Sequence, residues 1–222
     1  MHGISNSRAY GHRVGLYKVL LSSGYKVLAV DYRGFADASK TKVTEETLVE
    51  DGRVAIDWVR KSLRSDDKML VWGHSLGAAI ACRAVAEEQI ESVTCAWVNL
   101  LVLESPFNNL HDAVVNALKS KGKLAALMFN LKKQMKKAVM MFQSDKWIKE
   151  VTSPFVILHA EDDDTVDVEL GKKLFTAARD GGKEAIDLIT LNKLLILGHN
   201  NIFQLPTLGK IINNYTSKKI HE

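Results

Sequence analysis

Short, almost wholly apolar runs recur along this chain, and longer amphipathic stretches separate them. The runs span residues 26–32, 68–73, 100–104 and 155–159, with a weaker one at 186–191. Runs without polar alternation are typical of strands that are covered on both faces, as in parallel sheets. The alternation therefore predicts an α/β fold: a mostly parallel sheet with right-handed crossovers and helices on both faces.

The stretch between the first two runs has the clearest helical pattern. Its predicted span is residues 45–63, and its predicted apolar face consists of Leu48, Ala55, Trp58, Val59 and Leu63. The whole chain, at 222 residues with 46% hydrophobic and 25% charged residues, suits one globular domain, which we expect over residues 1–222.

Composition narrows the classes of function. A net charge of +4 is too modest to indicate a nucleic-acid partner, and two cysteines are too few for a disulfide framework. No apolar run reaches the roughly 18 residues of a membrane-spanning helix, and no secretory signal is recognisable. No metal or cofactor is expected.

The motif Gly73-His74-Ser75-Leu76-Gly77 fits G-x-S-x-G. It directly follows a predicted strand and leads into a helix of small residues, 78–85. In this context the serine occupies a strained strand-to-helix turn, and glycine on both sides lets the backbone approach closely. Ser75 is therefore the candidate nucleophile, and the backbone N–H of Leu76 is a candidate oxyanion donor. The alternative is a glycine-flanked serine in an ordinary tight turn.

A serine hydroxyl needs a histidine held by a carboxylate, and after this turn the chain order is serine, acid, histidine. Four consecutive carboxylates, at positions 161–164, follow a late strand, and spacing alone does not choose among them. His199, after the last strand, is the candidate base. His159 precedes the acid and breaks the order, whereas His74 is expected to point away from the nucleophile.

Several segments together resemble one family. They are Trp72-Gly73-His74-Ser75-Leu76-Gly77, Leu103-Glu104-Ser105-Pro106-Phe107 and Leu158-His159-Ala160-Glu161-Asp162-Asp163. The chain resembles the α/β-hydrolase-domain lipases that act on lysophosphatidylserine and monoacylglycerol (the abhydrolase domain-containing protein 12 family). The resemblance implies the α/β-hydrolase fold and a serine esterase or lipase that acts on lysophospholipids or monoacylglycerols.

The resemblance also implies site residues and a location. The family pattern His-Ala-x-x-Asp-x-x-Val places the acid at Asp163 and the base at His199. The loop after His2-Gly3 is expected to give a second oxyanion donor, the N–H of Ile4. Members of the family carry a transmembrane helix before the hydrolase domain, which faces the lumen of the endoplasmic reticulum or the exterior. Leu194-Leu195-Ile196-Leu197 is more apolar than the family pattern.

His2-Gly3 resembles the end of the third strand of this fold. That strand lies between the strand ending at Asp31 and the one ending at Gly73, and the sequence does not contain it. We therefore expect a partial domain without its N-terminal strands. Unpaired backbone groups in the middle of a sheet are costly, so an inactive chain is an alternative.

Residues 108–149 interrupt the strand–helix rhythm, and we expect a cap or lid there. No acidic residue occurs from Ala113 to Ser144, and lysines recur on an amphipathic pattern, among them Lys132, Lys133, Lys136 and Lys137. A basic amphipathic helix predicts contact with an anionic lipid surface over the active site. The equal alternative is a cap helix with a solvated lysine face.

Three functions compete at this point. The first is a lipase or esterase, with a lipid substrate and contact with a membrane surface. The second is a peptidase of the same fold, which usually carries an extra domain. The third is a non-catalytic, truncated hydrolase-like protein.

Overall fold

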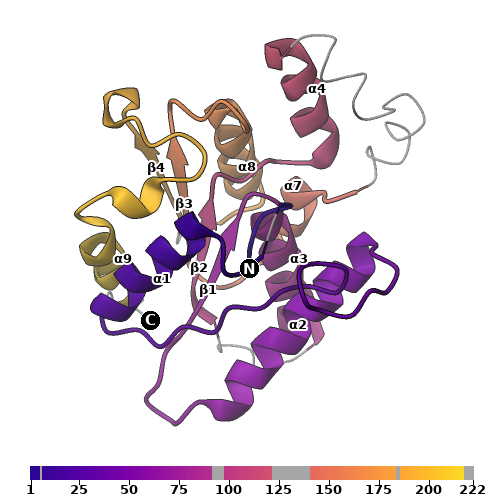
Figure 1. Cartoon of the computed structure of the whole chain (residues 1–222), viewed down its shortest axis with the longest axis vertical. Coiled ribbons are helices and arrows are strands. Elements are labelled where there is room, and N and C mark those ends of the chain that lie inside the picture. Colours follow the sequence, from indigo (N-terminus) through magenta and orange to yellow (C-terminus); the bar gives the residue numbers. More distant parts are fainter. Residues whose placement is uncertain (6, 92–97, 122–140, 184–185, 218–222) are drawn as a thin grey trace.

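The computed structural model describes residues 1–222 except 6, 92–97, 122–140, 184–185 and 218–222. Its described strands form one parallel sheet in the order β1-β2-β3-β4, with their carboxyl ends at the same edge (Figure 1). They are β1 (Met69–His74), β2 (Val98–Glu104), β3 (Phe155–Ala160) and β4 (Ile186–Leu191). Four of the five predicted strands are thus confirmed.

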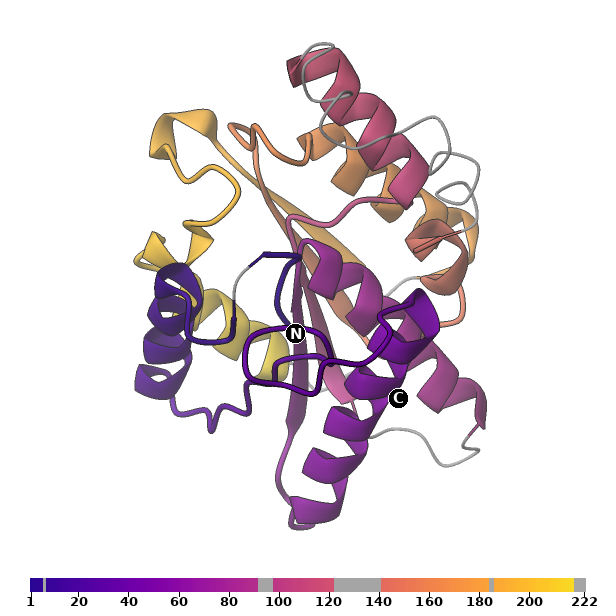
Figure 2. The same cartoon turned by 45° about the vertical axis from the view of Figure 1, so that its right-hand side comes forward.

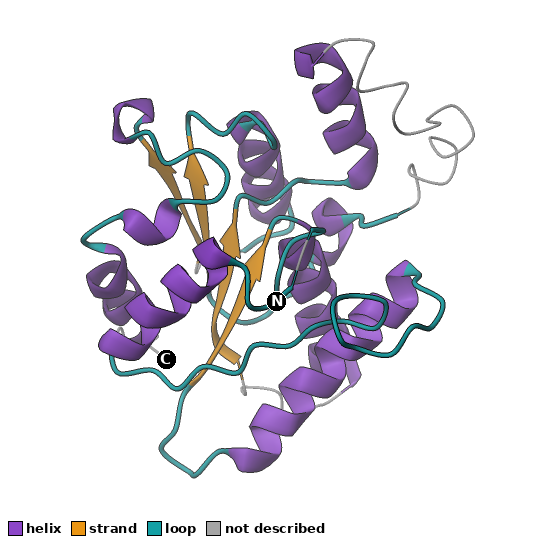
Figure 3. Ribbon diagram, viewed as in Figure 1, coloured by secondary structure: helices purple, strands orange, loops and turns teal. Residues whose placement is uncertain are grey.

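Helices cover both faces of this sheet (Figures 2 and 3). One face carries α2 (Glu45–Ser62), α3 (Leu76–Glu91), α7 (Ser144–Trp147) and α8 (Val168–Asp180). The other carries α1 (Gly11–Ser22), the 3-10 turn η2 (Ile202–Gln204) and α9 (Leu208–Ser217). Beyond the carboxyl edge lie α4 (Leu110–Lys121) and the 3-10 turn η1 (Lys193–Leu195) (Figure 1).

The strand side chains alternate between two cores. Val71, Leu101 and Ile157 pack into the core under α2, α3 and α8. Trp72, Val102 and Val156 pack into the core under α1 and α9. Because successive side chains of a strand point to opposite faces, a strand with a core on each side must be apolar at nearly every position. This is why the apolar runs predicted the sheet.

A capping box formed by Thr44 and Thr47 fixes the start of helix α2. The N–H of Thr44 donates to the hydroxyl of Thr47 at 2.9 Å, and the N–H of Thr47 donates back to that of Thr44 at 3.3 Å. The predicted apolar face is wrong at Trp58, which is 59% exposed. The prediction is confirmed at Leu48, and α2 also buries Val49, Gly52 and Ile56, together with Glu45.

The strand predicted at residues 26–32 is not formed. A strand needs a partner about 4.8 Å away to satisfy its N–H and C=O groups, and no described strand lies beside this segment. An open hollow of about 670 Å³ separates it from α2, lined in part by Leu28, Val30, Val54 and Trp58. The apolar run therefore stays extended without a ladder, and Leu28 is 46% exposed.

The first residue continues the sheet beyond β1. The amino group of Met1 donates to the carbonyl of Trp72 at 2.7 Å, and the N–H of His74 donates to the carbonyl of Met1 at 3.1 Å. These two bonds follow the outer edge of β1 at its carboxyl end. They bring His2 and Gly3 to the side of the turn that follows β1.

Candidate active site

The turn after β1 holds Ser75 in a left-handed backbone conformation, with φ of 55°. This conformation is costly for a residue with a side chain and occurs where the surrounding structure enforces it. A Cβ atom at Gly73 would lie 2.3 Å from the carbonyl oxygen of Gly77, and one at Gly77 would lie 2.4 Å from that of Met1. Glycine is thus required on both sides of the serine, as the motif predicted.

Backbone contacts fix the nucleophile turn to the neighbouring strand. The N–H of Ser75 donates to the carbonyl of Glu104, the last residue of β2, at 2.9 Å. Leu76 is the first residue of α3, so its N–H has no partner within the helix. Its role as an oxyanion donor stays a prediction that this position suits.

The acid loop after β3 distinguishes Asp163 from its three neighbours. Asp163 is buried, and its Oδ1 accepts from the N–H groups of Thr165 and Val166 at 2.9 and 2.8 Å. Its Oδ2 lies 2.7 Å from Nδ1 of His199. Of the other three, Asp162 accepts from the N–H of Gly198 at 3.0 Å and so supports the loop that carries His199.

The charge state of Asp163 follows from these contacts. Burial raises the pKa of its carboxyl group, but hydrogen bonds from His159 and His199 outweigh burial and hold that pKa well below its ordinary value. Asp163 is therefore a carboxylate, and Nδ1 of His199 is the protonated nitrogen that donates to it. The same tautomer leaves Nε2 of His199 as the basic nitrogen.

Two further histidines contact the predicted pair. Chain order had set His159 aside, and His74 was set aside because its side chain was expected to point away from Ser75. Nε2 of His159 lies 3.3 Å from Oδ2 of Asp163 and 2.8 Å from the carbonyl of Val166. Its place at the end of a buried strand, four residues before the acid, was the available signal. Nε2 of His74 lies 2.9 Å from the carbonyl oxygen of His199.

Burial keeps the imidazole ring of His74 neutral. It lowers the pKa of His74 to about 3, with a smaller contribution from the neighbouring His199. A neutral His74 can donate Nε2–H to the carbonyl of His199, which couples the backbone of the base loop to the residue next to Ser75.

The N-terminal loop lies against Ser75, the candidate nucleophile. A Cβ atom at Gly3 would be 3.3 Å from Cβ of Ser75 and 3.2 Å from Nδ1 of His74. The structure therefore brings the loop that contains Ile4 to the nucleophile turn, where a second oxyanion donor was predicted. Ile4 itself is 67% exposed.

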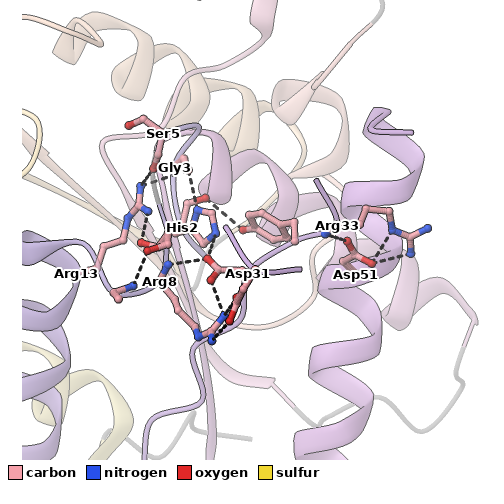
Figure 4. Close-up of polar contacts among 12 residues, drawn as sticks. His2, Gly3, Ser5, Arg8, Arg13, Asp31, Arg33 and Asp51 are labelled. Atoms are coloured by element: carbon pink, nitrogen blue, oxygen red, sulfur yellow. Dashed lines mark hydrogen bonds and ion pairs between the residues drawn. The ribbon is translucent and has the colours of Figure 1, made fainter. Parts of the chain in front are cut away.

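The buried guanidinium group of Arg13 holds this loop, as Figure 4 shows. It donates to the carbonyls of Gly3, Ser5 and Ser7 at 3.3, 2.6 and 2.6 Å. The C=O and N–H of one trans peptide unit point in opposite directions. Anchoring the carbonyl of Gly3 therefore turns the N–H of Ile4 away from Arg13. Sequence reasoning missed Arg13, which a sequence offers only as a charged residue on a helix.

Other polar contacts in Figure 4 tie this loop to the rest of the chain. The N–H of Arg8 donates to Asp31 at 2.6 Å, and Nε2 of His2 lies 3.0 Å from the same carboxylate. Arg33 in turn pairs with Asp51 of α2. Asp31, predicted to end a strand, instead serves as an anchor for the loop.

A buried carboxyl group lies next to the site at the end of β2. Glu104 accepts from the indole N–H of Trp72 at 2.7 Å, and burial raises its pKa to about 7. Within the described part of the chain, no three histidine, cysteine, aspartate or glutamate side chains gather as they would around a metal ion. The predicted lid lysines, Lys132, Lys133, Lys136 and Lys137, lie outside the described residues.

Known proteins resemble this arrangement in fold. A Pyrococcus furiosus esterase superposes with a TM-score of 0.72 at 18% identity, over 97% of this chain and 78% of the esterase. An α/β-hydrolase from Vibrio vulnificus gives a TM-score of 0.76 at 17% identity, over 96% and 71% of the two chains. The predicted α/β-hydrolase fold is thus confirmed.

Relatives in sequence are more specific. The chain is 36% identical to human protein ABHD12B, over 99% of this chain and 60% of the relative. It is 31% identical to the lysophosphatidylserine lipase ABHD12 of Macaca fascicularis, over 98% and 55%. The chain thus spans little more than half the length of these relatives. Among the residues described, no helix is both long and apolar enough to cross a membrane.

Residues 1–148 match the protein family Hydrolase_4, described as serine aminopeptidase, S33. This match covers the nucleophile turn and the end of β2, and the sequence relatives extend over nearly the whole chain. The chain belongs to this family of α/β-hydrolases.

Proposed function

We propose that this chain is a serine hydrolase that cleaves acyl esters of lysophospholipids or monoacylglycerols. Its nucleophile is Ser75, its base His199 and its acid Asp163. The observation that carries the proposal is the 2.7 Å contact between Nδ1 of His199 and Oδ2 of Asp163, at the same sheet edge as the strained turn of Ser75. An acid–histidine pair beside a strained serine supports acyl transfer.

The mechanism follows from these roles. Nε2 of His199 takes the proton of the Ser75 hydroxyl as its oxygen attacks the acyl carbon of the ester. The N–H groups of Leu76 and Ile4 stabilise the resulting oxyanion, and Arg13 holds the second of them in place. His199 then gives its proton to the leaving alcohol oxygen, which breaks the ester bond and leaves an acyl-serine. Water, activated by the same histidine, releases the fatty acid.

The proposed substrate rests on the relatives and on the sequence between β2 and β3. The ABHD12 relatives are named lysophosphatidylserine lipases, which supports a lipid ester. We also propose a cap at residues 108–149 of a single domain, where Lys132, Lys133, Lys136 and Lys137 would contact anionic head groups. By the same resemblance, the site would face the lumen of the endoplasmic reticulum or the exterior, at a membrane.

A peptidase is the second candidate, because the matched family is described as a serine aminopeptidase. Both candidates use the same three residues, so the substrate separates them. A non-catalytic protein is the third candidate, and it predicts an unreactive Ser75.

The test is labelling of the purified chain with a fluorophosphonate probe, beside hydrolysis of a short soluble ester and of an aminoacyl amide. The proposal expects labelling of Ser75, ester turnover and little amide turnover. Ser75→Ala should remove both labelling and turnover while the circular dichroism spectrum stays unchanged. Ester turnover above about 1% of the original in that variant would contradict the assignment, since losing a triad member costs several orders of magnitude. A faster amide reaction would favour the peptidase.

A further inference from the structure

Three apolar side chains project from the tip of the loop that leads to His199. Leu194, Leu195 and Ile196 are 81%, 48% and 80% exposed, and together we call them the apolar knuckle. They lie on and just after η1, beyond the carboxyl end of β4 and at the edge of the sheet where the site lies (Figure 1). Single exposed apolar residues are ordinary, but three adjacent ones at the rim of a site are not.

The backbone at Ile196 makes this exposure harder to explain by stability alone. Ile196 has φ of 50°, in the left-handed region that β-branched residues rarely adopt. Its side chain is mostly exposed, so packing within the chain offsets little of that strain. Asparagine or glycine would fit the same turn better and would remove an apolar surface from water.

The backbone N–H groups of the knuckle are hydrogen-bonded within the loop, so moving the knuckle out of water leaves none of these donors without a partner. The N–H of Leu194 donates to the side chain of Asn192 at 2.9 Å, and the N–H of Leu195 to its carbonyl at 2.9 Å. The N–H of Ile196 donates to the carbonyl of Lys193 at 3.2 Å. Unsatisfied backbone donors make it costly to insert a loop into lipid, and at these three positions the donors are satisfied internally.

The knuckle is also fixed to the acid loop. The N–H of Lys193 donates to Glu161 at 3.2 Å, and the N–H of Gly198 donates to Asp162 at 3.0 Å. These bonds hold both ends of the knuckle to the two residues that directly precede Asp163. Whatever the knuckle binds is therefore held at a set position relative to Asp163 and His199.

We propose that the apolar knuckle inserts into a lipid surface and holds the mouth of the active site against it. The inference rests on the proposed function, because a lipid ester must leave such a surface to reach Ser75. A convex apolar tip whose donors are satisfied fits the apolar interior of a lipid layer. Lys193 is the only basic residue from position 184 to 198, and Glu161 and Asp164 are exposed on the adjoining acid loop. At the knuckle itself, attraction to anionic lipid is therefore not the driving force, and the surface that the knuckle fits is a zwitterionic one. Contact of the predicted cap lysines with anionic head groups would be a separate contribution, which phosphatidylcholine vesicles leave out.

The experiment measures binding of the whole chain to phosphatidylcholine vesicles by flotation, at low and high salt. The test variant is Leu194→Asn with Ile196→Asn, since asparagine tolerates the left-handed turn and should leave the fold intact. The control is Leu21→Asn with Ile90→Asn, which removes the same residue types from exposed positions on α1 and α3, at 57% and 58% exposure against 81% and 80% in the knuckle. Hydrolysis of a short soluble ester reports whether the catalytic residues are undisturbed.

The proposal expects the vesicle partition coefficient to fall at least about tenfold in the test variant and to stay within about twofold in the control. Wild-type binding should change little between low and high salt. An equal loss in both variants, no wild-type binding, or binding abolished by salt would each overturn it. Loss of self-association in the test variant, with vesicle binding intact, would instead assign the knuckle to a protein contact. Because vesicle binding needs no turnover, it separates this proposal from the labelling of Ser75 that tests the proposed function.

Discussion

The two sides of β1 behave differently although their sequences look alike. On one side, β1 pairs with β2, and β3 and β4 complete the described sheet, all in parallel pairing. On the other side, residues 26–32 carry an equally apolar run, but they form no strand and face a hollow. The loops that leave β1, β3 and β4 carry Ser75, Asp163 and His199. Along the outer edge of β1, the backbone hydrogen bonds found among the described residues are those of Met1.

The difference teaches that an apolar run encodes the ability to form a strand and not the strand itself. A ladder needs a partner at the correct spacing, which no local pattern supplies. The nucleophile turn is the opposite case, because its strain is fixed by glycines within two residues of Ser75. The turn at Ser75 therefore forms even though it follows the edge strand of the described sheet, next to the open hollow.

The largest effect that would break this comparison is on the acid. Asp163→Asn should lower kcat on a short soluble ester by roughly four orders of magnitude, because an amide cannot hold His199 in the productive tautomer. Asp164→Asn, one residue away and exposed, is the control and should change kcat by less than about threefold. Asp162→Asn should fall between them, since Asp162 supports the backbone of Gly198. If Asp162→Asn were the most damaging, the register of the acid loop would be wrong.

Glu104 offers a test of how fully the β2 side of β1 excludes water from its buried side chains. Its pKa in the fold, about 7, lies above the ordinary glutamate value. The fold therefore prefers the protonated form, so this group's stabilising effect is complete below about pH 4 and is lost as pH rises through 7. At pH 8, Glu104→Gln should raise the free energy of unfolding, measured with urea, by on the order of 2–3 kcal/mol relative to the wild type. At pH 5 the difference between the two proteins should be smaller. If the free energy of unfolding changed with pH in the same way in both proteins, the pH dependence would belong to a group other than Glu104.

The parts that the sequence predicted were those set by local chemistry. The four confirmed strands follow from burial on both faces, and the serine turn follows from its glycines. The prediction of Asp163 as the acid came from family resemblance, since four adjacent carboxylates cannot be told apart by spacing. The roles of His74 and Arg13 depend on contacts with residues that the fold brings near, some of them distant in sequence, so no local signal marks them. His159 had one local signal, which is its position near the end of a buried strand, four residues before Asp163.

Arg13 tests the contact between the N-terminal loop and the turn after β1, because it holds that loop against Ser75. Arg13→Gln should lower kcat on a soluble ester about tenfold and leave KM nearly unchanged, since a loosened Ile4 N–H affects the transition state and not substrate binding. Arg8→Gln is the matched control, because Arg8 lies on the same loop but contacts Asp31 and Asp37. Affinity for a boronic acid that places an oxygen in the oxyanion site should fall with kcat. Equal losses in both variants would reduce Arg13 to a general role in stability.

The smallest effect concerns the hollow, and it sets two residues of one helix against each other. Ile56 of α2 is buried at 5% exposure, whereas Trp58 is 59% exposed and lines the hollow. Ile56→Ala should lower the free energy of unfolding by about 2–5 kcal/mol, because it leaves a cavity in the core. Trp58→Ala should lower it by less than about 1 kcal/mol, although tryptophan loses far more volume, since little of that side chain is packed. Urea unfolding at neutral pH measures both. A cost at Trp58 equal to that at Ile56 would mean that the hollow is filled in solution, and that residues 26–32 pack closely against α2 after all.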